Sequence, residues 1–515
     1  MSLVSIMFSV FVTVALLLYY LLPRKAQSAV LFGMSVLFYL SYGIQPVLFL
    51  VFAVGVTYTA AVRMGALYEA AGNEEDRRAA MASAKKSSRR ILIIAMLLNF
   101  GMLAFLKYTN FFIDNINGVL SAGLPHLKLL LPLGISYYTF QSVGYLLDVY
   151  WQRSRCENNL FRLALFLVFF PYMVQGPISR YGQLAGQLYE NHDFDWANIH
   201  RGLLRILWGL FKMMVLAEWA SVYREAIFAD PDGLAGIALF GVLLYTVELY
   251  GNFSGGIDIV LGVASMFSIR MEENFRQPFF SVSITDFWQR WHITQGSWMR
   301  DYVFYPLTLS GFMKKFGKKT KKAFGKKVGR TIPVCLANLI VFFLVGVWHG
   351  PTWGNIGWGI YNGVIIAFSV LMENRYKIWK KALHINDKSK GWHLFMILRT
   401  FALINISWYF DCVTSLSKAL KMMRYSVTAF DPSLFLTIPA GKLGTDFTPY
   451  ALGILLGGCL ILFCVSLWKE RGADPEADVL KAPVALQVLL FLLLLLAVLA
   501  LGPQSAGRGF IYAQF

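Results

Sequence analysis

The chain has 515 residues, of which 57% are hydrophobic, 16% aromatic and only 15% charged. Soluble domains contain roughly 45–50% apolar and about 25% charged residues, so this composition excludes a soluble enzyme. Apolar runs close to the ~20 residues that a helix needs to cross a bilayer recur along the whole chain, with Lys/Arg-rich breaks between them. We therefore predict an all-α polytopic membrane protein that forms one integral domain over residues 1–515.

The apolar runs predict about 11 to 14 transmembrane helices together with re-entrant segments. We expect the first run to be an uncleaved span with the N-terminus outside, because this orientation places most basic breaks in the cytoplasm. The loop that holds Lys418, Lys421 and Arg424 is the exception. In chain order the runs lie at 3–22, 28–43, 46–66, 91–107, 129–150, 160–175, 201–220, 234–252, 256–270, 332–348, 354–372, 394–410, 448–467 and 484–502.

Two charged segments interrupt the apolar pattern. Residues 69–90 are charged and Ala-rich, which favours a short interfacial or solvated cytoplasmic helix. The net charge is +18, and the stretch 314–330 carries nine basic residues and no acidic one. This stretch is interpreted as a cytoplasmic loop that touches anionic lipid headgroups, or as a docking site for an acidic partner or an anionic acyl donor. No recognition fold surrounds it, so we predict no nucleic-acid binding.

Polar residues concentrate between Glu248 and Asn362. Within this region, the segment from Thr285 to Leu307 mixes charged residues with aromatics and is too polar for a lipid-facing span. We predict a re-entrant or interior segment, because charged or irregular backbone at membrane depth needs protein or water around it.

Two histidines in this region are candidates for chemistry. His349 ends an apolar run at Trp348-His349-Gly350-Pro351, where proline must stop the helix and leave local carbonyls open to polar partners. His292 lies inside the interior segment. A buried neutral imidazole can take a proton from a hydroxyl as it attacks an acyl carbon. The alternative interpretation of each histidine is an interhelical hydrogen bond.

Other chemistries lack their motifs. The chain contains no HExxH, GxSxG, Walker or GxGxxG sequence. Its five cysteines form neither a CxxC pair nor a metal-ligand spacing, so we predict no metal site. Ser254 lies in Asn252-Phe253-Ser254-Gly255-Gly256, which favours a small-residue helix contact.

Several longer stretches resemble one known family. They are PLGISYYTFQSVGYLLDVY (Pro132–Tyr150), FFPYMVQGPISRY (Phe169–Tyr181), YGNFSGGIDIVLG (Tyr250–Gly262), ENFRQPFFSVSITDFWQRWHITQGSWMRDYVFYPL (Glu273–Leu307), VGVWHGPTWGNIGWGIYNG (Val345–Gly363) and GFIYAQF (Gly509–Phe515). On these stretches, with core motifs over residues 132–363, the chain resembles the membrane-bound O-acyltransferases (MBOAT) of the bacterial alginate O-acetyltransferase branch. The neighbouring branch transfers D-alanyl groups to teichoic acids.

The resemblance implies an MBOAT-like fold with a central tunnel. It also implies that His349 is the catalytic histidine and His292 the second characteristic histidine. We predict a substrate-binding site formed by Asn252, Asp258, Arg300, Asp301, Trp348 and Asn355, with an interior ion pair and helix packing as the alternative role of the first four. Two departures leave donor and acceptor open: Asn252 replaces the usual Asp, and PLTLSGFMKKFGKK follows the Arg-Asp motif instead of Gly-Gly-Asn-Arg.

The function expected from the resemblance is O-acetylation of an extracellular polysaccharide by a multi-pass protein of the bacterial cell membrane. The donor would be acetyl-CoA or another cytoplasmic acyl thioester, with no bound cofactor. The expected partners are membrane lipids and an extracytoplasmic SGNH-type acyltransferase or the polysaccharide itself. D-alanyl transfer to teichoic acid and, in a different class, a polysaccharide or lipid exporter remain alternatives.

Overall fold

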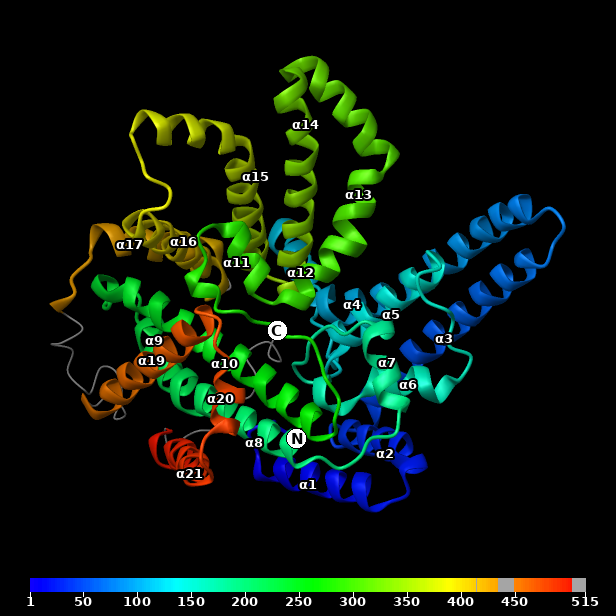
Figure 1. Ribbon diagram of the computed structural model, residues 1–515. Helices are drawn as coiled ribbons and strands as arrows, with labels where there is room; N and C mark the ends of the chain where they lie inside the picture. The colour runs from blue at the N-terminus through cyan, green and yellow to red at the C-terminus, as the bar shows by residue number, and fades with distance from the viewer. Residues whose placement is uncertain (414, 434–448, 503–515) are drawn as a thin grey trace. The chain divides into compact units, whose positions relative to one another are not determined.

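The computed structural model describes residues 1–413, 415–433 and 449–502, so the terminal motif Gly509–Phe515 lies outside the described residues. The described chain is helical, and its one extended pairing is an isolated bridge between Phe275 and Trp291 (Figure 1). This confirms the predicted all-α class. The chain divides into two compact units, residues 1–206 with 256–272 and residues 207–255 with 273–515.

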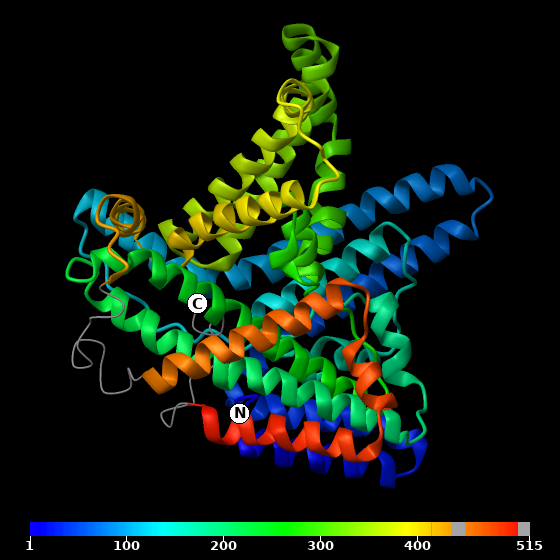
Figure 2. The same cartoon turned by 60° about the vertical axis from the view of Figure 1, so that its left-hand side comes forward.

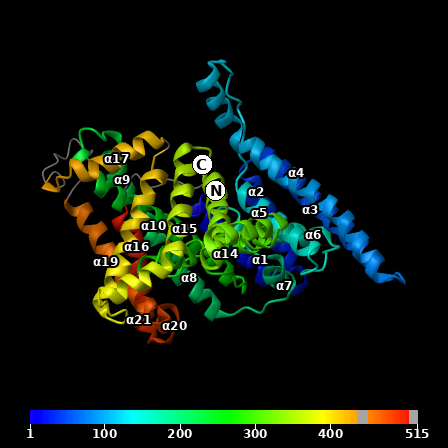
Figure 3. The same ribbon diagram turned by 90° about the horizontal axis from the view of Figure 1, so that it is seen from above.

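The first unit contains a long hairpin of two helices, α3 (Ile44–Gly72) and α4 (Arg77–Leu120), which lie side by side (Figure 3). Asp76 caps the second of them by accepting a hydrogen bond from the Ala79 backbone N–H. The segment 69–90 is therefore no separate short helix: it forms the end of α3, a tight turn and the beginning of α4. The helices of this unit are α1 (Ile6–Leu21), η1 (Arg24–Ala26), α2 (Gln27–Leu40), α3 (Ile44–Gly72), α4 (Arg77–Leu120), α5 (Ile135–Tyr150), α6 (Leu160–Val168), η2 (Phe170–Tyr172), α7 (Tyr181–Tyr189) and most of α8 (Trp196–Leu210).

The second unit contains both candidate histidines and most of the polar segment. Its helices are η3 (Phe211–Ala217), α9 (Glu218–Ala229), η4 (Ala235–Ile237), α10 (Ala238–Met266, in part), η5 (Pro278–Phe280), α11 (Ile284–Arg290), α12 (Ile293–Met299), η6 (Arg300–Phe304), α13 (Tyr305–Leu309), α14 (Gly311–His349), α15 (Trp353–Ala382), α16 (Lys390–Asp411), α17 (Leu416–Thr428), α19 (Pro449–Glu470), α20 (Pro475–Lys481) and α21 (Val484–Leu501). Of these, η3 and η6 are π-helical.

Helix α14 consists of two arms that fold back on each other at Gly325, whose φ of 78° is one that glycine adopts at little cost (Figure 1). The Thr320 hydroxyl donates to the Gly329 carbonyl at 2.7 Å and ties the arms together. The basic stretch 314–330 is thus a helical hairpin, and the predicted loop is wrong in its local structure. The basic side chains are therefore held at fixed positions along two helical arms, whereas a loop would leave their positions variable.

The second arm of α14 packs closely on α15, and the two helices stay together along their length (Figures 2 and 3). Small residues allow this approach. A Cβ atom added to Gly346 would lie 2.5 Å from the Asn355 carbonyl oxygen, and one added to Gly359 would lie 2.4 Å from the Phe342 carbonyl oxygen. Close packing through small residues is typical of membrane helices.

Eight helices in the described part of the chain are long and apolar enough to cross a membrane, fewer than the 11 to 14 expected. Two causes explain the difference. The runs 234–252 and 256–270 belong to the single helix α10. Helices such as α1 and α2, with 16 and 14 residues, are shorter than a straight span of ~20 residues.

Candidate active site

The segment from Ile284 to Leu309 is broken into short pieces, in agreement with its predicted irregularity. Helix α11 ends at Arg290, His292 adopts a left-handed conformation with φ of 48°, and α12 begins at Ile293. Backbone bonds to the preceding strand-like stretch hold this turn: Arg276 N–H donates to the Arg290 carbonyl at 2.9 Å, and Ile293 N–H donates to the Asn274 carbonyl at 3.0 Å. Few non-glycine residues adopt a positive φ, and those that do are often found at functional sites.

The side chain of Asn274 fixes the tautomer of His292. Its Oδ1 accepts the Thr294 backbone N–H at 3.0 Å and the Thr294 hydroxyl at 2.9 Å, and it lies 3.2 Å from His292 Nδ1. A backbone N–H can only donate, so the oxygen of the amide must face this group and Nδ1 must carry the proton. His292 Nε2 is then the nitrogen with a free lone pair. It is buried and has no hydrogen-bond partner in the described ranges.

Aromatic rings enclose the two histidines. His292, whose exposed fraction is 3%, meets the Phe253 ring edge-on with 4.8 Å between ring centroids. The Trp348 ring lies 6.0 Å from His292 and 5.2 Å from His349. His349 also contacts Trp358 at 4.7 Å. The structure therefore brings the two predicted histidines to the same tryptophan, in a buried and largely apolar setting.

The last turn of α14 is shaped as the sequence predicted, because the helix ends at His349 and Gly350 is extended. Thr352 caps α15 by accepting the Asn355 backbone N–H at 3.1 Å. The Asn355 side chain is packed so closely on Gly350 that an added Cβ would lie 2.2 Å from its Nδ2. Asn355 thus lies against Gly350 and Trp348 against His349, and their predicted role in substrate binding stays a prediction.

A cavity of about 590 Å³ lies between the broken segment, the second arm of α14 and α15. Its volume is within the ~300–1,000 Å³ typical of small-molecule sites. His292 lines it, and the lining on α14 extends from Asn338 to Val345, about 10 Å at the helical rise of 1.5 Å per residue. His349 is not a lining residue and follows Val345 by about one turn. Two further lining residues, Trp288 and Gln295, have buried side-chain N–H groups without a hydrogen-bond partner among the residues described.

Arg300 lines the same cavity and begins the π-helix η6. Its Nε donates to Asp301 Oδ1 at 2.9 Å, so the two residues form a pair. The Arg300 side chain is 56% exposed, and such ion pairs add little stability. The guanidinium therefore retains donors for an anionic ligand, and π-helical turns are frequent at functional sites.

Asn252 and Asp258 do not line this cavity. Asn252 is buried on α10 and precedes Phe253, the ring that faces His292. Asp258 belongs to the first unit, where its Oδ1 accepts from Arg205 Nε and Nη2, each at 3.1 Å. For Asp258 this matches the alternative role of an interior ion pair. Ser254 accepts a hydrogen bond from the buried Lys212 Nζ at 2.8 Å, and so contributes a helix contact.

Sequence reasoning missed the residues that support the site. Asn274 stands 18 residues before His292, a separation that matches no ligand or triad spacing. Its only signal was a place in the stretch ENFRQPF. The contacts of Phe253 and Trp358 depend on how helices pack, which a single sequence does not contain.

Comparison with known proteins identifies the family of the chain. Residues 158–406 match the membrane-bound O-acyltransferase family, MBOAT. A probable alginate O-acetylase of Pseudomonas syringae is 32% identical over 77% of this chain and 69% of its own length, and one of Pseudomonas aeruginosa is 30% identical over 80% and 72%. A peptidoglycan O-acetyltransferase of Helicobacter pylori is 31% identical over 65% and 64%. The chain therefore belongs to the membrane-bound O-acyltransferase family and is a multi-pass membrane acyltransferase.

Proposed function

We propose that this acyltransferase moves acetyl groups from a cytoplasmic thioester donor to hydroxyl groups of an extracellular polysaccharide. The observation that carries the chemistry is the pair of buried histidines at Trp348, beside the 590 Å³ cavity. The choice of acetyl is supported by similarity to relatives named as a probable alginate O-acetylase and a peptidoglycan O-acetyltransferase. The bacterial cell membrane is the proposed location, since these relatives come from bacteria.

In this mechanism a hydroxyl oxygen attacks the carbonyl carbon of the thioester. The new C–O bond forms, the C–S bond breaks, and the thiol leaves with the proton that the hydroxyl gave up. His349 is the proposed base, and the lone pair of His292 Nε2 holds the hydroxyl or shares its proton. The unpaired N–H groups of Trp288 and Gln295 are the proposed donors to the acyl oxygen. Because these atoms are shielded from solvent, substrate entry must move neighbouring side chains.

The donor is proposed to enter from the face that bears the basic hairpin 314–330. Nine basic residues there attract the phosphates of a donor such as acetyl-CoA, and Arg300 at the cavity offers a planar guanidinium to the same groups. An SGNH-type acyltransferase outside the membrane is the proposed partner for delivery to the polysaccharide.

The test measures O-acetyl content of purified extracellular polysaccharide by NMR, in cells that carry wild type, His349→Ala, His292→Ala or His393→Ala at equal membrane abundance. His393 is an exposed histidine on α16 and serves as the matched control. We expect loss of ester in His349→Ala, a reduction in His292→Ala and no change in His393→Ala. Ester that is unchanged in His349→Ala would contradict its role as the base.

The deletion strain separates the alternatives. If deletion leaves O-acetyl content unchanged but removes alanyl esters and the reaction requires a carrier protein, the chain is a D-alanyltransferase. If deletion changes the amount of polysaccharide outside the cell while acyl content per sugar stays constant, acyl transfer to this polymer is excluded.

A further inference from the structure

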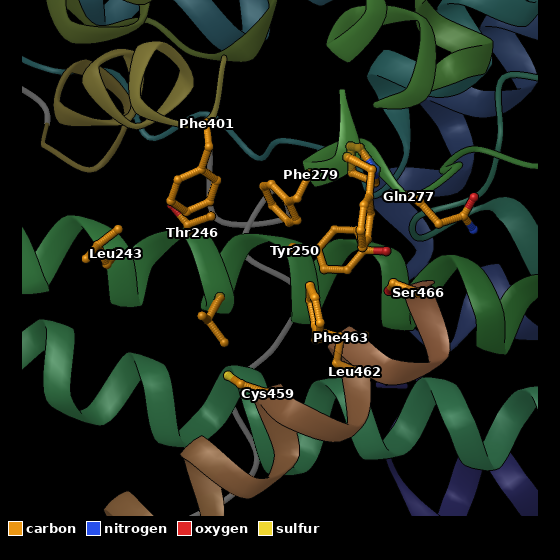
Figure 4. A pocket seen from close by; sticks show the side chains of 13 residues that line it. Leu243, Thr246, Tyr250, Gln277, Phe279, Phe401, Cys459, Leu462, Phe463 and Ser466 are labelled. Atoms are coloured by element: carbon orange, nitrogen blue, oxygen red, sulfur yellow. The ribbon is translucent and has the colours of Figure 1, made fainter. Parts of the chain in front are cut away.

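A second cavity, of about 350 Å³, lies in the same unit between α10, η5, α16 and α19 (Figure 4). Aromatic side chains form much of its wall. Tyr250 and Phe279 meet at 5.1 Å between ring centroids, Phe279 and Phe401 at 5.8 Å, and Phe280 stacks on Phe463 at 5.7 Å. Neither candidate histidine lines this cavity, so the proposed acyl transfer leaves it without a role.

We propose that this cavity binds one acyl chain of a membrane phospholipid. An apolar cavity of this kind holds hydrocarbon rather than water, because its walls offer too few polar partners. Thr246 is among its few polar residues, and the Thr246 hydroxyl is already bonded to Asn405 Oδ1 at 2.7 Å. A hydrocarbon chain gains dispersion contacts with all the lining atoms, which an empty void forfeits.

The cavity reaches the lipid-facing surface of the protein at α19. Only 17% of the apolar stretch of this helix is buried inside the described chain, so most of its surface faces the bilayer. Phe463 lines the cavity and is nevertheless 54% exposed, while Leu456 and Leu460 on the outer face are 62% and 63% exposed. Lipid chains therefore surround this side of the cavity, and the Phe463 ring faces both the lipid and the cavity.

The polar lining residues indicate where the ester end of the lipid lies. Gln277 and Ser466 lie near one another in the view, on the side opposite Leu243 and Phe401 (Figure 4). Ser466 is one turn from Glu470, the last residue of α19, so this side lies close to the membrane surface. A phospholipid chain that enters here can leave its ester oxygens beside Gln277 and Ser466 and extend toward Cys459. Under the predicted orientation this is the inner leaflet.

The occupant would also support the larger cavity. Tyr250 and Phe279 line the lipid cavity, and both contact Trp291, at 6.0 Å and 6.3 Å between ring centroids. Trp291 lines the larger cavity and is followed by His292. A lipid chain in the smaller cavity would thus contact Tyr250 and Phe279, the rings that pack against Trp291 in the wall of the larger cavity.

The experiment uses the purified full-length protein in phosphatidylcholine nanodiscs that contain a phosphatidylcholine with a diazirine in one acyl chain. After illumination, peptide mass spectrometry locates the adducts. We expect adducts on Phe279 and Phe401 inside the cavity, besides those on Leu456 and Leu460. Cys459→Trp, which fills the cavity, should reduce the inner adducts at least tenfold and leave the outer ones unchanged. Leu460→Trp, one residue along the same helix, is the matched control and should keep the inner adducts.

A second measurement does not depend on how a variant folds. In wild type, unlabelled phosphatidylcholine should compete with the probe for the cavity, so that excess unlabelled lipid abolishes the inner adducts. As the probe is increased, the inner adducts should saturate at one lipid per protein. Outer adducts should rise in proportion to the probe. Outer adducts without inner ones would overturn the proposal, as would inner adducts that persist in a folded Cys459→Trp protein. Both results are independent of whether the chain transfers acetyl groups.

Discussion

The two cavities of the second unit share an aromatic boundary but differ in the chemistry of their walls. The larger cavity is lined by a broken segment that carries His292 and Arg300, and by buried N–H groups that have no hydrogen-bond partner in the described residues. The smaller cavity is lined by intact helices and η5, mainly with rings and aliphatic side chains. Unpaired buried polar atoms are costly, so a protein retains them where a ligand or a reaction uses them.

Cavity size therefore does not identify the active site of this membrane protein. Both volumes are of the order of a small ligand. What separates the two cavities is the presence, in the larger one, of groups that can accept a proton or donate to a ligand, since an irregular backbone also occurs at Gln277 in the smaller one. Variants of the two cavities can therefore be compared for their effects on acyl transfer.

The largest effect is expected from His349→Ala. General-base catalysis typically contributes ~10² to 10⁴ in rate, so acyl transfer by the purified protein should fall by about that factor. Cys459→Trp fills the smaller cavity, whose rings reach the larger one through Trp291, and should keep the rate within about tenfold, the effect of ~1.4 kcal/mol. Initial rates with a thioester donor and an oligosaccharide acceptor measure both. Equal losses in the two variants would mean that the cavities do not differ in function.

A smaller effect is expected from Gly346→Ala at the crossing of α14 and α15. The new Cβ would lie 2.5 Å from the Asn355 carbonyl oxygen, so one of the two helices must shift. Such a shift moves the last turns of α14, which line the larger cavity and carry His349. Overpacking of this kind costs about 1–3 kcal/mol. Thermal unfolding in detergent should show a lower midpoint, together with reduced activity.

Gly453→Ala on α19 is the matched control, because an added Cβ there meets no atom within 4 Å. Its unfolding midpoint should equal or slightly exceed that of wild type, since alanine favours helix. If Gly346→Ala were as stable and as active as Gly453→Ala, the close helix crossing would have no part in shaping the larger cavity.

A smaller effect again is expected from Asn274→Ala, which acts through His292. Without Oδ1 the imidazole can adopt either tautomer and rotate, so acyl transfer should fall by about tenfold, or ~1.4 kcal/mol. The decisive measurement is a double-mutant cycle with His292→Ala. We expect Asn274→Ala to have no further effect when His292 is absent. Additive losses would show that Asn274 supports the fold in general and not the orientation of this ring.

The sequence predicted best those features that depend on residues close to one another along the chain. Apolar runs predicted most helices, and Gly350-Pro351 predicted the end of α14 at His349, since both depend on neighbouring residues. The sequence also identified His292, Arg300 and Asp301 as members of one polar segment. For Asp258 it left a cavity role and an interior ion pair open, because only the packing of α8 on α10 reveals Arg205 as its partner.

The folded basic hairpin was missed for a related reason. A run of lysines with three glycines predicts a solvated loop, yet the hydrogen bond from the Thr320 hydroxyl to the Gly329 carbonyl joins two helical arms around Gly325. That contact joins residues nine apart, which hydrophobic periodicity does not detect. The smaller cavity could not be predicted either, because its lining residues come from four separate elements.

The smallest effect is expected at Asp232, a surface residue that lines neither cavity. Asp232 accepts from Lys421 Nζ at 2.9 Å and from the Tyr425 hydroxyl at 2.6 Å. These hydrogen bonds, from Lys421 first and Tyr425 second, lower the pKa of Asp232, and the bond to Asp232 raises the pKa of Lys421. The carboxylate contribution to stability is therefore present above the unfolded pKa of about 3.9 and lost as pH falls through the folded value. The lysine contribution is present below about 10.4 and lost as pH rises.

We therefore expect the difference in unfolding midpoint between wild type and Asp232→Asn to be small and constant from about pH 5 to pH 9. Toward pH 3 the difference should shrink, because the wild-type carboxylate becomes protonated as well. Calorimetry of the purified proteins over this range measures it. A difference that grows in acid would mean that Asp232 is not stabilised as a carboxylate. Asp232 lines neither cavity, so Asp232→Asn should leave the rate of acyl transfer between pH 5 and 8 unchanged.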